Sequence, residues 1–429
     1  MHRNISIPDP PERTPSTPKS AMQAAIEETF SFDGPPDAMI SVAGKVYLYF
    51  GGNGYFGLQA DPEVLAATCE AVLRYGVGTA TTRTAFTSPP VFEVERRTAE
   101  MLGTPHALYT ASGYVANQIL LESLEKTFDR IFIDEATTGL LFNAIKILHG
   151  VAASPIRFAH RDANDLKTQI DKMLQPHQRP LVLTDGVFFS QGTIAPLDEY
   201  DAVLAKYDGA AVLIDDSHGF GILGEQARGT LEFFGFTPGR ANRTFQEIEG
   251  SLGINSEVQN SPLSKTISAQ TPVRYYFSTK LSNAVGGFGG VLPGSEALVQ
   301  RILERSRAVY EASPPPTPIA AATAKGIELL FERTDLRAVL KKNMQSLRKK
   351  LRGLGILIEE SPLPIVTFQL GSAYNMRRIQ RTLAQGGILI TYLPRLPGLG
   401  PDGTLHLTVF ATHTPDQLDR LVEALKNEL

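Results

Sequence analysis

A carboxylate and an imidazole stand three residues apart directly after one apolar segment of the chain. The segment covers residues 210–214, and Asp215 and His218 follow it in the order Asp-Asp-Ser-His-Gly-Phe-Gly. Such a run is typical of a buried parallel strand, and open α/β sheets bind ligands beyond the carboxyl ends of their strands. An acid there can hold a cationic ring nitrogen, and a histidine at this spacing can face the same pocket. Asp185 also ends an apolar run, but nothing beside it suggests chemistry, so we interpret it as a loop start.

A second group of candidate residues opens a predicted helix after the apolar residues 107–109. Ser112, Gly113 and Tyr114 begin the sequence Ser-Gly-Tyr-Val-Ala-Asn. Free backbone N–H groups at a helix start bind phosphate, and glycine permits close approach. An ordinary N-cap serine produces the same pattern, so this motif alone leaves both interpretations open.

Glycine and histidine patterns elsewhere argue against other kinds of site. The glycines within residues 286–290 precede a predicted strand instead of opening a helix, so a dinucleotide-binding loop fails on its context. The histidines outside the motif at residue 218 lack metal-ligand spacing, so no metal site is expected.

Composition predicts a globular protein of two domains. The 429 residues exceed one ordinary core, and 42% of them are hydrophobic and 20% charged. A net charge of -4 gives no reason to expect a nucleic-acid partner, and no apolar stretch reaches the length of a membrane span. The single cysteine, Cys69, excludes an intrachain disulfide and fits a reducing compartment, so we expect a cytoplasmic location.

Strand and helix patterns alternate around the candidate residues. We expect strands at residues 46–50, 130–134, 180–185, 210–215, 273–279 and 290–292, and helices at residues 62–75, 114–128, 197–207 and 295–310. This rhythm predicts an α/β fold with a mainly parallel sheet and right-handed crossovers. In the first of these helices one apolar face is expected, formed by Val64, Leu65, Cys69, Val72 and Leu73.

The domain boundaries follow changes in composition. We expect a flexible proline-rich arm at residues 1–20, an N-terminal segment at 21–60, a large domain at 61–311 and a small α+β domain at 312–429, beginning at three consecutive prolines. The small domain should contain strands at residues 364–369, 388–392 and 405–410 and a last helix with a capping box at its start. Residues 236–272 indicate a long loop or insertion.

Six ordered segments resemble one enzyme family. They are Asn-Gly-Tyr-Phe-Gly-Leu from Asn53, Tyr-Gly-Val-Gly at 75–78 followed by Arg83, Arg-Phe-Ala-His at 157–160, Thr-Asp-Gly-Val-Phe at 184–188, Ile-Ala-Pro-Leu at 194–197 and Gly-Ile-Leu-Gly-Glu at 221–225. Together they resemble the α-oxoamine synthases, which are fold-type I enzymes dependent on pyridoxal 5'-phosphate (PLP). The resemblance runs from about residue 44 to the C-terminus.

The resemblance implies a decarboxylating condensation of an amino acid with an acyl thioester, with PLP as the cofactor. It implies that Asp215 holds the pyridinium nitrogen, that His218 contacts the ring hydroxyl, and that Ser112, Gly113 and Tyr114 line the phosphate side. Family members are usually dimers with shared sites, so a homodimer is expected.

Four positions depart from the family pattern where the chemistry should occur. The resemblance places the Schiff-base lysine at Asn283, the histidine that stacks on the cofactor at Thr138, a serine at Phe189 and the carboxylate-binding arginine at His406. An amide cannot form the imine, and a neutral histidine does not replace an arginine.

Lys280 is the candidate that restores the missing amine. It follows Thr279 at the end of the predicted strand 273–279, in a Ser-Thr-Lys order that resembles Schiff-base segments of other fold-type I enzymes. We assign both residues to the cofactor site, with Lys280 as the catalytic amine. The alternative is that Lys280 replaces a family threonine and points at phosphate or solvent.

The departures also leave open which residues bind the substrate and whether the chain is active. We assign Asn53, Arg83, Arg395 and His406 to the substrate side, with either arginine taking over the carboxylate. The competing hypothesis is a catalytically silent homologue that acts as a structural or regulatory partner in a heterodimer. Retention of both Asp215 and His218 favours the enzyme, because a chain that discarded PLP has little need for them.

Overall fold

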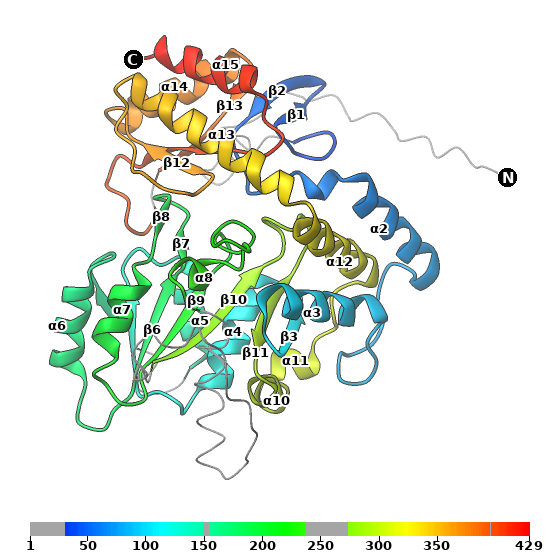
Figure 1. The fold of residues 1–429 in the computed structure, drawn as a ribbon, viewed down its shortest axis with the longest axis vertical. Coiled ribbons are helices and arrows are strands. Elements are labelled where there is room, and N and C mark those ends of the chain that lie inside the picture. The colour runs from blue at the N-terminus through cyan, green and yellow to red at the C-terminus, as the bar shows by residue number, and fades with distance from the viewer. Residues whose placement is uncertain (1–30, 149–153, 237–272, 395) are drawn as a thin grey trace, which may run out of the picture.

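The computed structural model describes residues 31–148, 154–236, 273–394 and 396–429. A larger α/β part surrounds a central sheet, and a smaller part lies above it in the view of Figure 1. The expected arm at residues 1–20, most of the expected insertion and Arg395 lie outside the described residues. Within the described ranges, no helix is long and apolar enough to cross a bilayer.

The central sheet has seven strands in the order β3-β11-β10-β9-β6-β4-β5. In chain order they are β3 (His106–Thr110), β4 (Arg130–Asp134), β5 (Ile156–Phe158), β6 (Pro180–Asp185), β9 (Ala211–Asp215), β10 (Arg274–Lys280) and β11 (Gly290–Gly294). Only β11 runs against its neighbours β10 and β3, and the other pairings are parallel. The predicted mainly parallel sheet is therefore confirmed.

Helices cover both faces of this sheet because its strands carry apolar residues on both sides. The helices are α4 (Gly113–Leu124), α5 (Gly139–Ala144), α6 (Ala163–Met173), α7 (Leu197–Leu204), α8 (Thr230–Phe233), α10 (Glu296–Arg305) and α11 (Arg307–Glu311). Leu213 packs with Leu120 of α4 on one face, whereas Val212 and Ile214 pack with Leu204 of α7 on the other. The sheet edge that carries Asp215 is thereby held between two cores.

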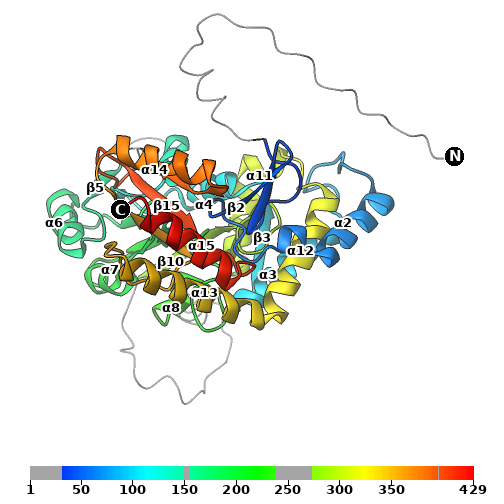
Figure 2. The ribbon, with the colours of Figure 1, turned by 90° about the horizontal axis from the view of Figure 1, so that it is seen from above.

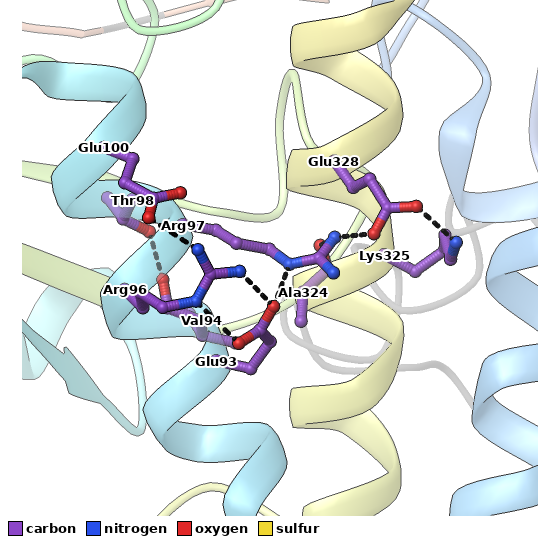
Figure 3. A network of polar contacts seen from close by, with 9 residues as sticks. All are labelled: Glu93, Val94, Arg96, Arg97, Thr98, Glu100, Ala324, Lys325 and Glu328. Atoms are coloured by element: carbon purple, nitrogen blue, oxygen red, sulfur yellow. Dashed lines mark hydrogen bonds and ion pairs between the residues drawn. The ribbon is translucent and has the colours of Figure 1, made fainter.

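Helices α2 (Pro62–Tyr75), α3 (Pro89–Leu102) and α12 (Thr317–Glu332) form a further layer beside β3. Charged side chains join α3 to α12 (Figure 3). Glu93 accepts hydrogen bonds from Arg96 and Arg97, and Arg97 also binds Glu328, which pairs with Lys325. The hydrogen bond from Arg96 is the largest cause that lowers the pKa of Glu93 to about 2.

Both ends of the chain build the small domain. Its elements are β1 (Met39–Val42), β2 (Lys45–Tyr49), α13 (Thr334–Gly353), β12 (Ile365–Phe368), α14 (Ala373–Gln385), β13 (Ile388–Leu389), β14 (Thr391–Leu393), β15 (Thr404–Thr408) and α15 (Pro415–Lys426). One sheet has the order β1-β2-β13 and the other β12-β15-β14. Seen from above, α13, α14 and α15 lie over the larger part (Figure 2). The expected capping box at Thr414 and Gln417 is present.

Short elements complete the fold around the site. They are η1 (Leu58–Ala60), η2 (Ile145–Ile147), β7 (Val187–Phe188) and β8 (Thr193–Ile194). The pair β7–β8 extends from the end of β6 toward the small domain, where the ring of Phe189 meets His406 of β15. The carboxyl edge of the sheet therefore faces the small domain.

Two expected elements are divided in the structure. The strand expected at 388–392 is wrong as a single strand, because β13 pairs with β2 while β14 pairs with β15 in another sheet. The helix expected at 295–310 is interrupted at Ser306, whose backbone is extended (φ -86°, ψ 111°).

The apolar face expected on α2 is mostly exposed. Leu65, Val72 and Leu73 are 49%, 39% and 88% exposed and Cys69 is exposed too, whereas Val64 of this face and Ala71 are buried. Periodicity identifies an apolar face correctly, but it does not say which partner covers that face. In this single chain the face is uncovered.

Candidate active site

Asp215 ends β9 as a buried carboxylate whose orientation is fixed by its neighbours. Its Oδ2 accepts a hydrogen bond from Nδ2 of Asn117 at 2.7 Å, and its Oδ1 accepts from the N–H of Ser217 at 3.1 Å and from the Ser217 hydroxyl. The Ser278 hydroxyl in turn donates to Oδ1 of Asn117. A carboxylate offers about four acceptor positions, so these three donors leave room for one more, such as a ring N–H.

The start of α4 supplies a site for an anion at the same edge of the sheet. Ser112 caps the helix, with its Oγ accepting the N–H of Val115 at 3.2 Å. The first N–H groups of a helix lack acceptors within the helix, so those of Gly113 and Tyr114 are available to a phosphate. Tyr114 is 37% exposed and lies at the rim.

The side chain of Lys280 crosses the start of α4. A Cβ placed on Gly113 would lie 2.2 Å from Cγ of Lys280 and 3.1 Å from its Cδ and Cε, so only glycine permits this packing. The backbone N–H of Lys280 donates to Oγ of Ser217 at 3.2 Å, which ties the end of β10 to the residue beside Asp215. The half-buried lysine has no ion-pair partner for Nζ among the described residues.

Strand pairing explains why these groups meet. Ser278 is the partner of Asp215 in the parallel register of β10 and β9, so Lys280 lies two residues beyond the acid along the neighbouring strand. Thr279 between them is buried, and its hydroxyl donates to the carbonyl oxygen of Asp216 at 3.3 Å. The structure thus brings Lys280 to the same edge of the sheet as Asp215, and the Thr279 hydroxyl is hydrogen-bonded to the end of β9.

His218 is a neutral imidazole in this site. The hydroxyl oxygen of Tyr55 lies 2.7 Å from Nδ1 of His218, and Nδ2 of Asn283 lies 3.5 Å from the same atom. Burial lowers the pKa of His218 to about 3, and the charges of Lys280 and His406 act in the same direction. The ring of Phe189 stacks on the imidazole, with centroids 4.9 Å apart and planes inclined by 29°.

Asn283 occupies the position at which the resemblance places the Schiff-base lysine. The residue is 4% exposed, and its Nδ2 donates to the carbonyl oxygen of Ser217 at 2.7 Å. The amide therefore lies between the backbone beside Asp215 and the ring of His218. It holds these two neighbours and offers no amine.

At β15, His406 occupies the position at which the resemblance implies an arginine. His406 on β15 is 1% exposed, and neither of its ring nitrogens has a hydrogen-bond partner. Burial lowers the pKa of His406 to about 4, although the backbone of Phe189 lies close enough to offset this in part. The ring centroids of Phe189 and His406 are 4.2 Å apart. A neutral aromatic pair thus replaces the arginine that the resemblance implies.

Thr138 and Asp185 form a polar contact beside the site. The N–H and hydroxyl of Thr138 donate to the two carboxyl oxygens of Asp185 at 3.1 and 3.2 Å. Burial, followed by the charge of Asp215, raises the pKa of Asp185 well above its usual value. Asp185 is paired with Asp215 in the register of β6 and β9, so its interpretation as a mere loop start is incomplete.

The residues assigned to the substrate side do not all converge. Nη2 of Arg83 donates to Oε1 of Glu95 at 2.6 Å, and the same oxygen accepts the N–H of Tyr109, whereas Nε and Nη1 of Arg83 are buried without a partner. Asn53 has a buried Oδ1 without a partner, which leaves it able to accept from a ligand. Arg395 lies outside the described residues.

Three polar neighbours of the retained residues were not identified from the sequence, namely Tyr55, Asn117 and Ser217. Each lies inside a segment that was noted for other residues, and Tyr55 meets His218 from 163 positions away. The helical period supplies one signal, because Asn117 lies four places after Gly113 and therefore on the same face of the helix.

A separate cavity of about 860 Å³ lies between α13 and the turn that follows His218. Phe56, Ile222, Leu340, Met344 and Arg348 are among the residues that line it. Asp215, His218 and Lys280 do not line it, so it adjoins the site without containing the reactive groups. No group of three metal-ligating side chains occurs within the ranges that the structure covers.

Comparisons with known proteins agree with this architecture. The model of the family "Aminotransferase class I and II" matches residues 46–425. The 8-amino-7-oxononanoate synthase of Nitrosococcus oceani is 30% identical over 396 residues, which cover 92% of this chain and 94% of that protein. The enzyme of the same name from Stutzerimonas stutzeri is 32% identical over 395 residues, covering 91% and 90%.

A solved structure shows the same fold. Serine palmitoyltransferase from S. paucimobilis, with PLP and myriocin bound, has a TM-score of 0.78 over 91% of this chain and 89% of its own, at 23% identity. The fold is that of the fold-type I PLP-dependent transferases. The chain belongs to the aminotransferase class I and II family and, within it, to the α-oxoamine synthases.

Proposed function

We propose that this chain is a PLP-dependent acyltransferase that condenses an amino acid with an acyl thioester and releases carbon dioxide. The observation that carries the proposal is Asp215, which is buried, held by three donors and left with one acceptor position. Membership of the α-oxoamine synthases supports the reaction class, because the matching relatives are 8-amino-7-oxononanoate synthases.

In this proposal each residue on the cofactor side binds a different group of PLP. Asp215 holds the ring nitrogen, the start of α4 at Ser112 and Gly113 binds the phosphate, and His218 donates to the ring oxygen. PLP, once bound, supplies the electron sink for carbanion chemistry, whereas the protein supplies orientation and electrostatics. The neutral state of His218 suits a hydrogen-bond donor that does not compete for the proton of the ring nitrogen.

Lys280 supplies the amine in this proposal. Its side chain crosses Gly113, and its backbone N–H donates to Ser217. Its charge also helps to lower the pKa of His218. These contacts support a position between the start of α4 and Asp215, although the stem of Lys280 over the start of α4 also suits a phosphate-binding cation.

Recognition of the substrate carboxylate is proposed to depend on Arg395 or Arg83 instead of His406. Burial keeps His406 neutral against Phe189, whereas Arg83 pairs with Glu95 through Nη2 and has Nε and Nη1 without partners. Asn53 retains an unpartnered acceptor that fits an ammonium or hydroxyl group of the substrate. We infer that the donor is a smaller or differently anchored amino acid than one gripped by a buried arginine.

We infer that the chain acts as a homodimer. The uncovered apolar face of α2, at Leu65, Val72 and Leu73, continues into the segment before α3, where Phe86 is 77% exposed. Burial of this face against a second copy would remove apolar surface from water. A cytoplasmic location fits the single cysteine, and both inferences remain proposals.

The second candidate function is a catalytically silent subunit. Asn283 favours it, because the position of the family lysine is filled by a buried amide that is already hydrogen-bonded. In that case the partner would be an active homologue in a heterodimer, and Lys280 would serve only to bind phosphate.

Turnover distinguishes the two candidates. Purified chain is loaded with PLP and incubated with a panel of amino acids and acyl-coenzyme A thioesters while free thiol and carbon dioxide are measured. The enzyme requires release of both in equal amounts, dependent on both substrates and lost in Lys280→Ala. Tight binding of PLP without any release, for every pair in the panel, would support the silent subunit.

A further inference from the structure

The imidazole of His218 is held from three directions by residues of three separate segments. Tyr55 approaches Nδ1 at 2.7 Å, Asn283 approaches the same atom at 3.5 Å, and Phe189 stacks on the ring face. Two of these three residues, Phe189 and Asn283, stand where the chain departs from its family. The departures therefore pack directly on a residue that is retained.

The direction of each hydrogen bond follows from the groups involved. The Asn283 amide directs Nδ2 at the carbonyl oxygen of Ser217, 2.7 Å away, and a carbonyl oxygen can only accept. The same Nδ2 is therefore the amide atom nearest His218. Tyr55 is fully buried, and burial raises the pKa of its hydroxyl, so the hydroxyl keeps its proton.

Two donors facing one nitrogen decide the protonation of the ring. Nδ2 of Asn283 can only donate, so Nδ1 of His218 is the acceptor in that contact, and the Tyr55 hydroxyl, which can donate or accept, is then a donor to the same atom. A neutral imidazole that accepts at Nδ1 carries its proton on Nε2. His218 is then a donor on its opposite side.

We propose that Tyr55 and Asn283 are positioning residues that fix His218 as the Nε2–H tautomer, so that it donates a hydrogen bond to the ring oxygen of a bound pyridoxal phosphate. The inference deepens the proposed function, since it rests on the cofactor proposed there. It assigns a role to Asn283 other than that of a lost lysine: Asn283 orients the histidine, and the amine comes from elsewhere.

Binding of pyridoxine 5'-phosphate tests the proposal without any covalent bond, because this ligand lacks the aldehyde. Affinity is measured by calorimetry for the wild type, Tyr55→Phe and Asn283→Leu. Each variant removes one donor to Nδ1, and we expect about fivefold weaker binding, as for the loss of one hydrogen bond. Tyr109→Phe is the matched control, since it removes an equally buried hydroxyl that bonds to the Phe288 carbonyl and leaves His218 untouched.

A ligand lacking the ring hydroxyl separates positioning from packing. For 3-deoxypyridoxine 5'-phosphate, Tyr55→Phe should bind as the wild type does, because no oxygen remains for Nε2–H to meet. Equal weakening for both ligands would show a merely structural role and overturn the proposal. Unchanged affinity for the hydroxyl-bearing ligand in both variants would overturn it as well.

The tautomer itself is visible by nitrogen NMR of protein labelled at histidine. The wild type should show a His218 ring with unprotonated Nδ1 and protonated Nε2, identified by its loss in His218→Gln, and Tyr55→Phe should show a mixture. A protonated Nδ1 in the wild type would contradict the inference. These results stand apart from turnover, because a chain that binds pyridoxine 5'-phosphate as expected but releases no thiol would refute only the proposed function.

Discussion

The two sides of the candidate site satisfy their polar groups in opposite ways. Around Asp215 the buried groups of Asn117, Ser217 and Ser278 form a connected set of hydrogen bonds, and one acceptor position stays open. Around His406 both ring nitrogens lack partners and an aromatic ring fills the adjacent space. Buried polar groups without partners are costly, so the first side is prearranged for a charged ligand and the second is not.

This difference indicates which half of the reaction the chain has kept. The side that carries Asp215 keeps the acid and the histidine of the family, although Asn283 and Thr138 replace two residues there, whereas at the other side His406 stands where the resemblance implies an arginine. A change of substrate with retention of the cofactor produces this pattern. Loss of both functions would leave no reason for the ordered network at Asp215.

The largest expected effect comes from removing the acid. Asp215→Ala should lower the affinity for PLP by about 100-fold, because it deletes a charge-assisted hydrogen bond and leaves the Asn117 amide unpaired. Fluorescence titration with PLP measures the affinity. Asp185→Asn is the control, since the raised pKa of Asp185 favours its uncharged form, which an amide resembles. Similar losses of PLP affinity in both variants would show that the network around Asp215 has no special role in binding the cofactor.

An arginine introduced at position 406 should improve the binding of amino acids only if the ring of Phe189 is removed as well. The double variant Phe189→Ser with His406→Arg is expected to bind amino acids about tenfold more tightly to the PLP-loaded protein, as for one carboxylate–guanidinium pair. His406→Arg alone should gain nothing, because the guanidinium would be buried against Phe189. Spectral titration with amino acids measures both. Equal gains in the single and double variants would show that Phe189 does not restrict this side.

A fall in pH should lower the free energy of unfolding, because the imidazole of His406 is buried in its neutral form. The pKa of His406 is about 4 in the folded chain and about 6.5 when unfolded, so only the unfolded state takes up a proton between these values. Stability is therefore lost as the pH falls from 6.5 toward 4, by about 2 kcal/mol at pH 5 relative to pH 7. Urea unfolding at both pH values should show a smaller loss in His406→Gln. An identical loss would contradict the burial effect.

The smallest effect is expected outside the site, in the charged contacts between α3 and α12. Glu93→Gln should lower the free energy of unfolding by less than about 1 kcal/mol at neutral pH, because exposed ion pairs contribute little. The pKa of Glu93 is lowered to about 2, so the wild-type contribution is present above pH 4.5 and is lost as the pH falls toward 2. Chemical unfolding across this range measures it. If the loss of unfolding free energy were as large as that expected from buried His406, the distinction between exposed and buried charges would be contradicted.

The fold and one side of the site could be predicted from the sequence because they depend on local patterns. Apolar strands ending in Asp215 and a helix starting at Ser112 meet at one edge by the geometry of a parallel sheet. Tyr55 could not be predicted, since its contact with His218 joins segments whose register is set only by the packing of the two domains.

Other features were hidden for a different reason. The face of α2 is apolar in its periodicity, but the pattern does not reveal that Leu73 is 88% exposed in a single chain. The neutral state of His406 depends on burial beneath Phe189, which a residue type does not encode. Local sequence patterns predict which reactive side chains lie at the same edge of the sheet. The protonation state of these side chains depends on the residues that bury them.

The central claim is that Lys280 forms the covalent bond to the cofactor, so that no lysine is required at the position of Asn283. Borohydride reduction of PLP-loaded protein, followed by peptide mapping by mass spectrometry, tests it directly. We predict a reduced cofactor adduct on the peptide that carries Lys280, absent from Lys280→Ala and unchanged in Lys342→Ala, which alters an exposed lysine of α13. An adduct on another lysine, or none in protein that binds PLP tightly, would contradict the account.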